Sequence, residues 1–103
     1  MERRFIASMR PYELTFIVRP EVEGGDLSVV VDRVKSLVTG GGGQVTEVNA
    51  WGRRQLAYPI NRMTEGQYFF VRAQLPARAV GELERDLRLT EQIVRYLIVR
   101  ADE

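Results

Sequence analysis

The segment Tyr12-Glu-Leu-Thr-Phe-Ile-Val18 decides the fold of this 103-residue chain. Every second residue in it is apolar and would share one face of a strand, namely Tyr12, Leu14, Phe16 and Val18. A period of two in a segment rich in aromatic and β-branched residues predicts a β-strand. Ile17 interrupts the opposite, polar face, and a strand that is apolar on both faces is typical of the middle of a sheet. We therefore expect the other elements to assemble around this strand.

A helix is predicted after the first strand. Apolar residues recur at three- and four-residue spacing from Leu27 to Val38, which is the pattern of a helix that packs one stripe on a sheet. Asp26 is the expected N-cap, because its side chain can accept a hydrogen bond from the first turn. The four glycines from Gly40 end the helix and permit a left-handed exit.

The second strand is predicted to begin at Gln44, to reach Trp51 and to continue toward Tyr58. Gly52 within it indicates a bulge or a close approach of another backbone. Pro59 lacks an amide hydrogen, which places this part of the strand at the edge of a sheet or already leaving it. The turn is expected over residues 61–66.

The remaining segments complete the pattern of the fold. Alternation from Gln67 to Leu75 predicts a third strand, Pro76 opens a second helix, and Ile93 to Arg100 forms the last strand. The order is strand, helix, strand, strand, helix, strand. With right-handed crossovers it predicts an α+β, ferredoxin-like split βαβ fold (βαββαβ), a four-stranded antiparallel sheet with two helices on one face.

Length and composition indicate one domain. We expect residues 9–103 to form it and residues 1–8 to be a flexible N-terminal extension. The chain contains no apolar run near 18 residues, so no membrane span is predicted, and its start lacks the apolar core of a secretory signal. The absence of cysteine is consistent with a cytosolic protein.

The residue types that are missing exclude several kinds of catalysis. Without histidine or cysteine the chain has no Ser-His-Asp or Cys-His nucleophile and no ordinary zinc site. It also lacks the glycine-rich phosphate loop and the dinucleotide fingerprint. A carboxylate-based enzyme stays open on these grounds, although no carboxylate pair stands out in the sequence. No cofactor, no metal and no small-molecule substrate are expected.

The segment Trp51-Gly-Arg-Arg-Gln-Leu-Ala-Tyr-Pro-Ile-Asn-Arg62 has the composition of a binding surface. It contains the only tryptophan, three arginines and no carboxylate, with apolar residues between the cations. Such a strand can lie on a phosphate backbone and contact neighbouring bases or ribose. The alternative is a solvated edge strand whose charges discourage association between sheets.

Two other functions use the same topology. An RRM-like binder of single-stranded RNA carries a cation, a glycine and stacking aromatics on its third strand. Here Glu65 replaces the cation and Gln67 replaces one aromatic, which weighs against that alternative. A small acyl-phosphate hydrolase is less favoured still, because no Gly-Arg phosphate cradle follows the first strand.

Three motifs resemble those of the bacterial small-subunit ribosomal protein six family. They are Met9-Arg-Pro-Tyr-Glu-Leu, Gly52-Arg-Arg-Gln-Leu-Ala-Tyr-Pro-Ile-Asn-Arg62 and Gly66-Gln-Tyr. The second fits the family's Gly-x-Arg/Lys-x-Leu-Ala-Tyr-x-Ile-x-Lys/Arg pattern throughout, and the resemblance extends from Met9 to about Arg100. Residues 1–8 precede the usual start, and the sequence ends soon after the last strand, whereas some members carry a longer C-terminal tail that lies on a protein partner.

The resemblance implies a structural component of the bacterial small ribosomal subunit in the cytoplasm. Members of the family bind the central domain of small-subunit ribosomal RNA together with small-subunit ribosomal protein eighteen. A net charge of +1 agrees with this, because a nearly neutral domain needs a partner to complete a tight RNA site. The expected RNA-binding residues are Arg53, Arg54, Arg62, Tyr58 and Arg10. The expected partner-interface residues are Trp51, Tyr68, Arg72 and Arg95.

Overall fold

The first strand lies in the interior of a four-stranded sheet, as its alternation predicts. The protein is represented by a computed structural model that describes residues 9–101, so the predicted extension over residues 1–8 lies outside the described residues. The elements are β1 (Met9–Val18), α2 (Gly25–Gly40), β2 (Gln44–Ile60), β3 (Met63–Pro76), a 3-10 turn (Ala77–Ala79), α3 (Val80–Arg88) and β4 (Ile93–Arg100).

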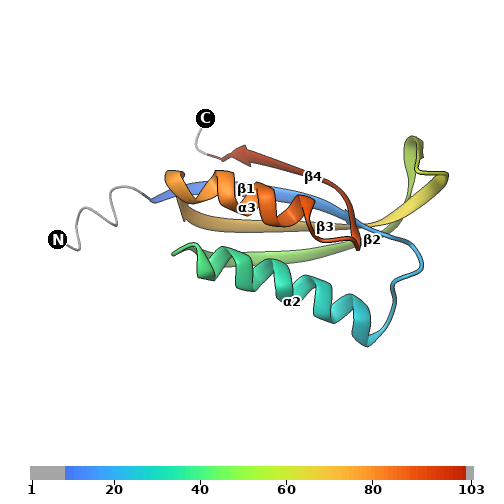
Figure 1. Cartoon of the computed structure of the whole chain (residues 1–103), viewed down its shortest axis with the longest axis horizontal. Coiled ribbons are helices and arrows are strands. Elements are labelled where there is room, and N and C mark those ends of the chain that lie inside the picture. Colours follow the sequence, from blue (N-terminus) through green and yellow to red (C-terminus); the bar gives the residue numbers. More distant parts are fainter. Residues whose placement is uncertain (1–8, 102–103) are drawn as a thin grey trace.

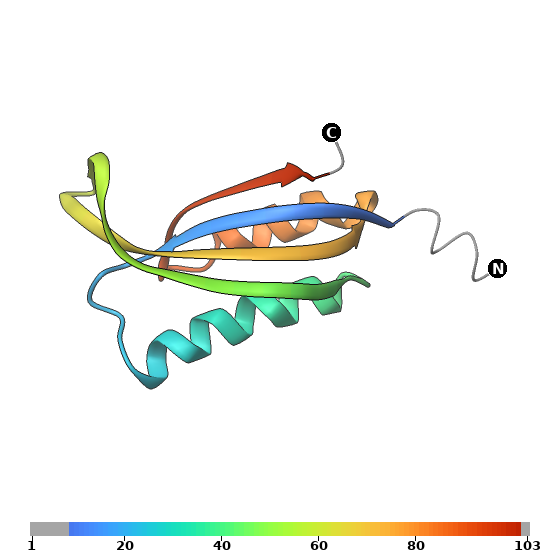
Figure 2. The ribbon, with the colours of Figure 1, turned by 180° about the vertical axis from the view of Figure 1, so that it is seen from behind.

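The strand order in the sheet is β2-β3-β1-β4, and each neighbouring pair is antiparallel. Tyr12 of β1 lies between Ala73 of β3 and Arg100 of β4. Both helices cover the same face of this sheet (Figure 1), and the view from behind shows the strands in front of α3 (Figure 2). The predicted split βαβ fold is therefore confirmed.

The core lies between the helices and the sheet. Alternate residues of β1 and β3 are buried there, and the rings of Phe16 and Phe69 stack with centroids 5.3 Å apart. The helices contribute apolar stripes, with Val34 of α2 and Leu87 of α3 fully buried. Each fully buried side chain of this size contributes about 1.5–3 kcal/mol relative to exposure, so this face supplies most of the stability.

The start of α2 differs from the sequence prediction. Gly24 is the N-cap, at φ 60°, and its carbonyl oxygen accepts hydrogen bonds from the amides of Leu27 and Ser28. Asp26 lies inside the first turn and makes no capping hydrogen bond, so its assignment as the N-cap was wrong. A backbone with positive φ favours glycine, and Asp26 remains favourable near the positive end of the helix dipole.

The β2–β3 hairpin is longer and its turn tighter than predicted. Only Asn61 and Arg62 form the turn, at φ 50° and 69°, and β3 begins at Met63. Two consecutive positive φ values are typical of the two-residue turns that match the twist of paired strands. The prediction of a turn over residues 61–66 was therefore wrong. Gly52 lies at φ 84° beside a shift of register, which confirms the predicted bulge.

Candidate RNA and partner interface

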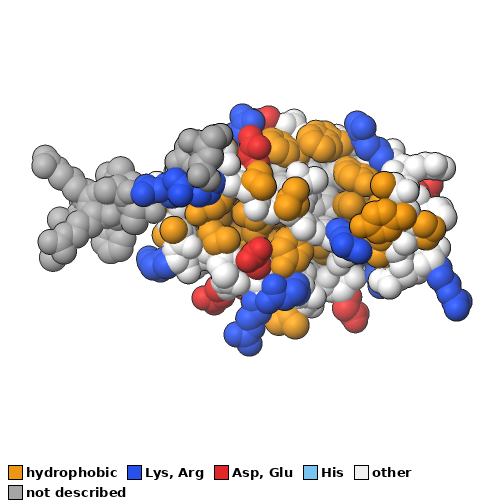
Figure 3. Space-filling model, turned by 90° about the horizontal axis from the view of Figure 1, so that it is seen from above, with side chains coloured by type: hydrophobic (Ala, Val, Ile, Leu, Met, Phe, Trp, Pro, Cys, Tyr) orange, Lys and Arg blue, Asp and Glu red, His pale blue; other side chains and the backbone are white. Residues whose placement is uncertain are grey.

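The face of the sheet opposite the helices, here called the open face, carries the candidate site. Its side chains come from the residues of β1 and β3 that alternate with the buried ones, and from β2 and β4 on either side. Viewed from above, hydrophobic side chains are interspersed with positively charged ones (Figure 3). A larger hydrophobic group lies at the end where the β2–β3 hairpin curls away from the helices (Figures 1 and 3).

An aromatic cluster occupies the open face where β2 meets β3. The rings of Trp51 and Phe70 stack with centroids 5.5 Å apart and planes at 6°. The guanidinium of Arg54 lies 5.9 Å from the Trp51 ring, and that of Arg72 lies 5.5 Å from the Phe70 ring. Trp51 nevertheless remains 45% exposed. A pre-ordered, exposed aromatic surface of this kind suits a partner, because little side-chain entropy is lost when it is covered.

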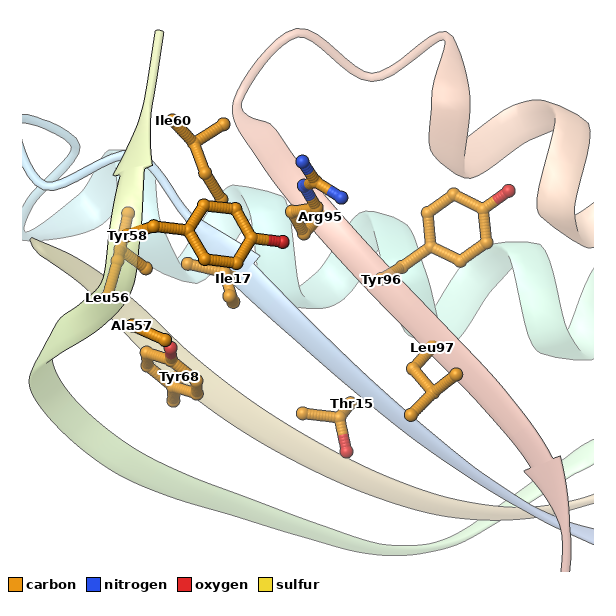
Figure 4. Close-up of a pocket in the computed structure, with 10 residues that line it drawn as sticks. All are labelled: Thr15, Ile17, Leu56, Ala57, Tyr58, Ile60, Tyr68, Arg95, Tyr96 and Leu97. Carbon is orange, nitrogen blue, oxygen red and sulfur yellow. The ribbon is translucent and has the colours of Figure 1, made fainter. Parts of the chain in front are cut away.

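The curled end of the hairpin forms a groove with the open face. This hairpin groove has a volume of about 260 Å³ and is lined by Thr15, Ile17, Leu56, Ala57, Tyr58, Ile60, Tyr68, Arg95, Tyr96 and Leu97 (Figure 4). Tyr58 points from β2 toward Arg95 of β4, whose guanidinium lies 5.9 Å from its ring. The structure thus brings together three predicted residues, Tyr58, Tyr68 and Arg95, at one mostly apolar groove.

Two of the predicted arginines are held by carboxylates of the same chain. Arg53 donates to Glu65 Oε1 and to the carbonyl oxygen of Pro20, both at 2.7 Å. Arg72 lies between Glu13 at 3.0 Å and Glu47 at 3.3 Å. Exposed ion pairs of this kind contribute only about 0–1 kcal/mol, so a ligand can displace them, but that exchange reduces the net gain from binding.

Two further arginines of the hairpin and Arg95 of β4 are in a different situation. Within residues 9–101 no carboxylate pairs with Arg54, Arg62 or Arg95. Arg54 and Arg95 lie over aromatic rings, and Arg62 is exposed in the tight turn. An arginine over a ring keeps its hydrogen-bond donors available at the ring's edge, so these three are better placed to receive phosphate than Arg53.

Arg10 lies apart from the other predicted RNA-binding residues. It pairs with Leu75 near one end of the β1–β3 ladder, whereas the hairpin turn extends beyond the other end. Its Nη1 donates to the carbonyl oxygen of Met9 at 3.3 Å. The predicted RNA-binding set is therefore divided between two ends of the molecule.

Sequence reasoning missed two contributors to this surface. Leu97 and Val99 expose 61% and 44% of their surface. Leu97 and Val99 follow Arg95 at intervals of two in a strand, so they share its face. The period of β4 would have identified them once Arg95 was placed on the open face.

Two other kinds of site are absent from the described residues. Over residues 9–101 no three carboxylates are grouped so that they could hold a metal ion. Neither helix in that range is long and apolar enough to cross a membrane.

Comparisons with known proteins agree with the resemblance in the sequence. Residues 11–100 match the family model described as ribosomal protein S6. The small ribosomal subunit protein bS6 of Moorella thermoacetica is 39% identical over 95 residues, covering 92% of this chain and 97% of its own length. The bS6 protein of Clostridium acetobutylicum is 38% identical, covering 92% of this chain and all of its own.

A solved structure supports the same assignment. The crystal structure of 30S ribosomal protein S6 from Thermotoga maritima superposes with a TM-score of 0.86 at 30% identity, covering 91% of this chain and 89% of that one. Sequence, family model and fold therefore agree over nearly the whole described chain. The chain belongs to the ribosomal protein S6 family, as its motifs predict, and is a structural, non-catalytic component of the small ribosomal subunit in the cytoplasm.

Proposed function

We propose that the protein binds the central domain of small-subunit ribosomal RNA together with small-subunit ribosomal protein eighteen. The observation that supports this most is the composition of the open face at its hairpin end. Stacked aromatics and exposed aliphatic side chains lie there beside arginines that have no carboxylate partner in the described chain. Soluble proteins rarely expose a large apolar patch, and where they do the patch is usually an interaction site.

The proposal assigns the RNA contact to the outer part of the hairpin. Arg54 and Arg62 provide the main phosphate contacts, and Tyr58, which is 59% exposed, stacks on or hydrogen-bonds to RNA beside them. Arg53 is a secondary contact that must first leave Glu65. Arg10 provides a separate contact at the opposite end of β1.

The protein partner covers the inner part of the open face. Trp51 and Tyr68 supply aromatic area, and Arg72 and Arg95 supply charge at its border. The net charge of +1 supports the need for a partner, since this domain alone releases few counterions from RNA. The RNA and the protein partner bind adjacent surfaces in this proposal. Binding of either one then raises the affinity of the protein for the other.

One contact in the structure weighs against an autonomous RRM-like function. Gln67 stands where that class of domain carries a stacking aromatic, and it is 8% exposed. Its Nε2 donates to the carbonyl oxygens of Arg19 at 2.9 Å and Val22 at 2.6 Å, on the side of the core. This position therefore supports the loop after β1 and is closed to a base.

The test measures binding of a central-domain RNA fragment with and without ribosomal protein eighteen. We expect tight binding only when both are present. Replacing Arg54 and Arg62 by alanine should lower the dependence of log affinity on log salt by roughly 1.8, because two phosphate contacts are lost. Removing Arg78 and Arg85, which lie on the 3-10 turn and α3, is the matched control and should leave the slope unchanged.

Two results would contradict the proposal. Tight RNA binding without the partner would favour an autonomous reader of RNA. An equal loss of salt dependence in the hairpin and control variants would show that RNA affinity depends only on the overall charge of the protein. The hairpin would then not be a specific RNA-binding site.

A further inference from the structure

The outer part of the β2–β3 hairpin leaves the four-stranded sheet at Gly66. β1 pairs with β3 only as far as Gln67, opposite Val18, and beyond that point β2 and β3 pair only with each other in the described sheet. This two-stranded segment, residues 53–66, is here called the outer hairpin, and it curls away from the helices (Figures 1 and 2). An isolated pair of strands is marginally stable in water, so its direction depends on what its base packs against.

Packing at the base of the outer hairpin requires a residue without a side chain at position 66. Gly66 is buried, and a Cβ added to it would lie 2.3 Å from Ile17 Cγ2 and 3.7 Å from Leu56 Cδ2. Cγ2 is attached directly to the β-carbon of Ile17, so it moves only if the whole side chain rotates. The backbone does not require glycine here, because the φ of Gly66 is not positive. Space is therefore the reason for a glycine at this position.

The missing side chain would lie on the inner side of the curl. Ile17 and Leu56 come from β1 and β2, and both line the hairpin groove on the open face (Figure 4). A larger residue at position 66 would force these side chains apart and lift the outer hairpin from the sheet. Arg53 adds a second restraint by donating to the carbonyl oxygen of Pro20, but that contact is exposed. The packing at Gly66 remains when Arg53 turns to RNA.

We propose that Gly66 is a positioning residue that fixes the direction of the outer hairpin and thereby the place of Arg54, Tyr58 and Arg62. The inference rests on the proposed function, in which these three residues contact RNA. Asn61 in the turn lies five positions before Gly66, which is about 17 Å along a strand, so a small change in direction at the base displaces the turn by several ångströms. A hydrogen bond to phosphate requires a donor–acceptor distance of about 2.7–3.2 Å, so a displaced hairpin loses it.

Distances between spin labels test the direction of the outer hairpin without RNA. The natural chain has no cysteine, so Ser36→Cys on α2 and Thr64→Cys on β3, both at exposed positions, can each carry a label. Gly66→Ala should shift the distance between the labels by several ångströms, and adding Ile17→Leu, which lacks Cγ2, should restore it. An unchanged distance in Gly66→Ala would overturn the proposal. If that variant does not fold, Ile17→Ala, which removes the packing at Gly66 from the other side, should broaden the distance distribution, and an unchanged distribution would overturn the proposal equally.

Affinity for the central-domain RNA, measured with ribosomal protein eighteen present, tests the consequence for binding. Gly66→Ala should lower the affinity at least about tenfold, because phosphate contacts are lost, and adding Ile17→Leu should restore it. Replacing Arg54 and Arg62 by alanine in the Gly66→Ala background should cause little further loss, since Gly66 acts through them. Gly43→Ala is the matched control: its Cβ would also meet neighbours at 2.6 Å, but between α2 and β2, so stability should fall without a loss of affinity.

The two experiments separate this inference from the proposed function. If replacing Arg54 and Arg62 in the natural protein does not affect RNA binding, the proposed function fails, while the label distances still decide the role of Gly66. If the arginines matter but Gly66→Ala binds RNA as tightly as the natural protein, the positioning role is overturned. Fully additive losses from the arginine and glycine changes would also overturn it, because Gly66 would then act elsewhere.

Discussion

The two faces of one sheet differ in how far their aromatic side chains are buried, although the same strands supply both. Phe16 on the helix face is fully buried and stacks on Phe69, while Phe70, one residue further along β3, stacks on a tryptophan that is 45% exposed. On the helix face, aromatic burial holds the fold together. On the open face a similar number of rings leaves apolar area uncovered, which is the condition for binding. Residue type alone therefore does not separate an aromatic side chain of the core from one available for binding; the side of the strand does.

The largest effect is expected from truncating the helix face. Phe16→Ala should lower the free energy of unfolding by about 3–5 kcal/mol, because it removes a buried ring and leaves a cavity. Phe70→Ala on the open face is the matched change and should cost clearly less. Chemical denaturation of both variants measures the difference. Equal losses would show that the open face is as much a core as the helix face.

A smaller effect is expected where α2 meets β2. A Cβ added at Gly43 would lie 2.6 Å from the carbonyl oxygen of Gln74 and 2.6 Å from Leu75 Cδ2. Gly43→Ala should therefore cost about 1–3 kcal/mol of unfolding free energy, as overpacking does. Gly40→Ala, which meets nothing within 4 Å, is the control and should be neutral or stabilising. Thermal unfolding measures the stability of both variants. A Gly40→Ala variant less stable than Gly43→Ala would contradict this prediction.

Truncating the aromatic cluster should affect binding more than folding. Trp51→Ala should change the free energy of unfolding by less than about 1.5 kcal/mol, since the ring is half exposed. Its effect on the complex with RNA and ribosomal protein eighteen should be at least about 2 kcal/mol, as for a central aromatic anchor. Calorimetric titration beside denaturation separates the two quantities. A loss confined to stability would place Trp51 with the core.

The smallest effect is expected from a change that tests the difference between arginines paired with a carboxylate and arginines without such a partner. Glu65→Gln removes the carboxylate that holds Arg53 at 2.7 Å. Stability should fall by no more than about 1 kcal/mol, because the pair is exposed. RNA affinity should rise a few-fold at low salt, since a negative charge is lost and a guanidinium is released. Unchanged affinity would mean that Arg53 does not approach RNA.

Local periodicity was enough to predict the fold, because burial alternates strictly along β1 and β3. The last strand, from Ile93 to Arg100, was predicted at its observed bounds. The errors lie where backbone conformation overrides side-chain preference. Gly24 caps α2 through its own positive φ, and Asn61 with Arg62 closes a two-residue turn that composition alone made too long.

The candidate site was predictable only in part. The sequence indicated which segment carries cations and aromatics, and the structure places Trp51, Tyr58 and Arg54 on exposed surface. It did not indicate that Glu65, twelve residues from Arg53, returns across the hairpin to hold that guanidinium. Such a pairing depends on register and on the bulge at Gly52, which shifts the facing residues by one.

The central claim is that RNA and protein partner both dock on the open face and the hairpin. Amide chemical shifts of the isotopically labelled protein, recorded before and after adding the central-domain RNA with ribosomal protein eighteen, test it most directly. We predict large changes along Trp51 to Arg62 and at Tyr68, Phe70 and Arg95, with α2 and α3 nearly unchanged. Changes concentrated on the two helices, with the hairpin unaffected, would contradict it.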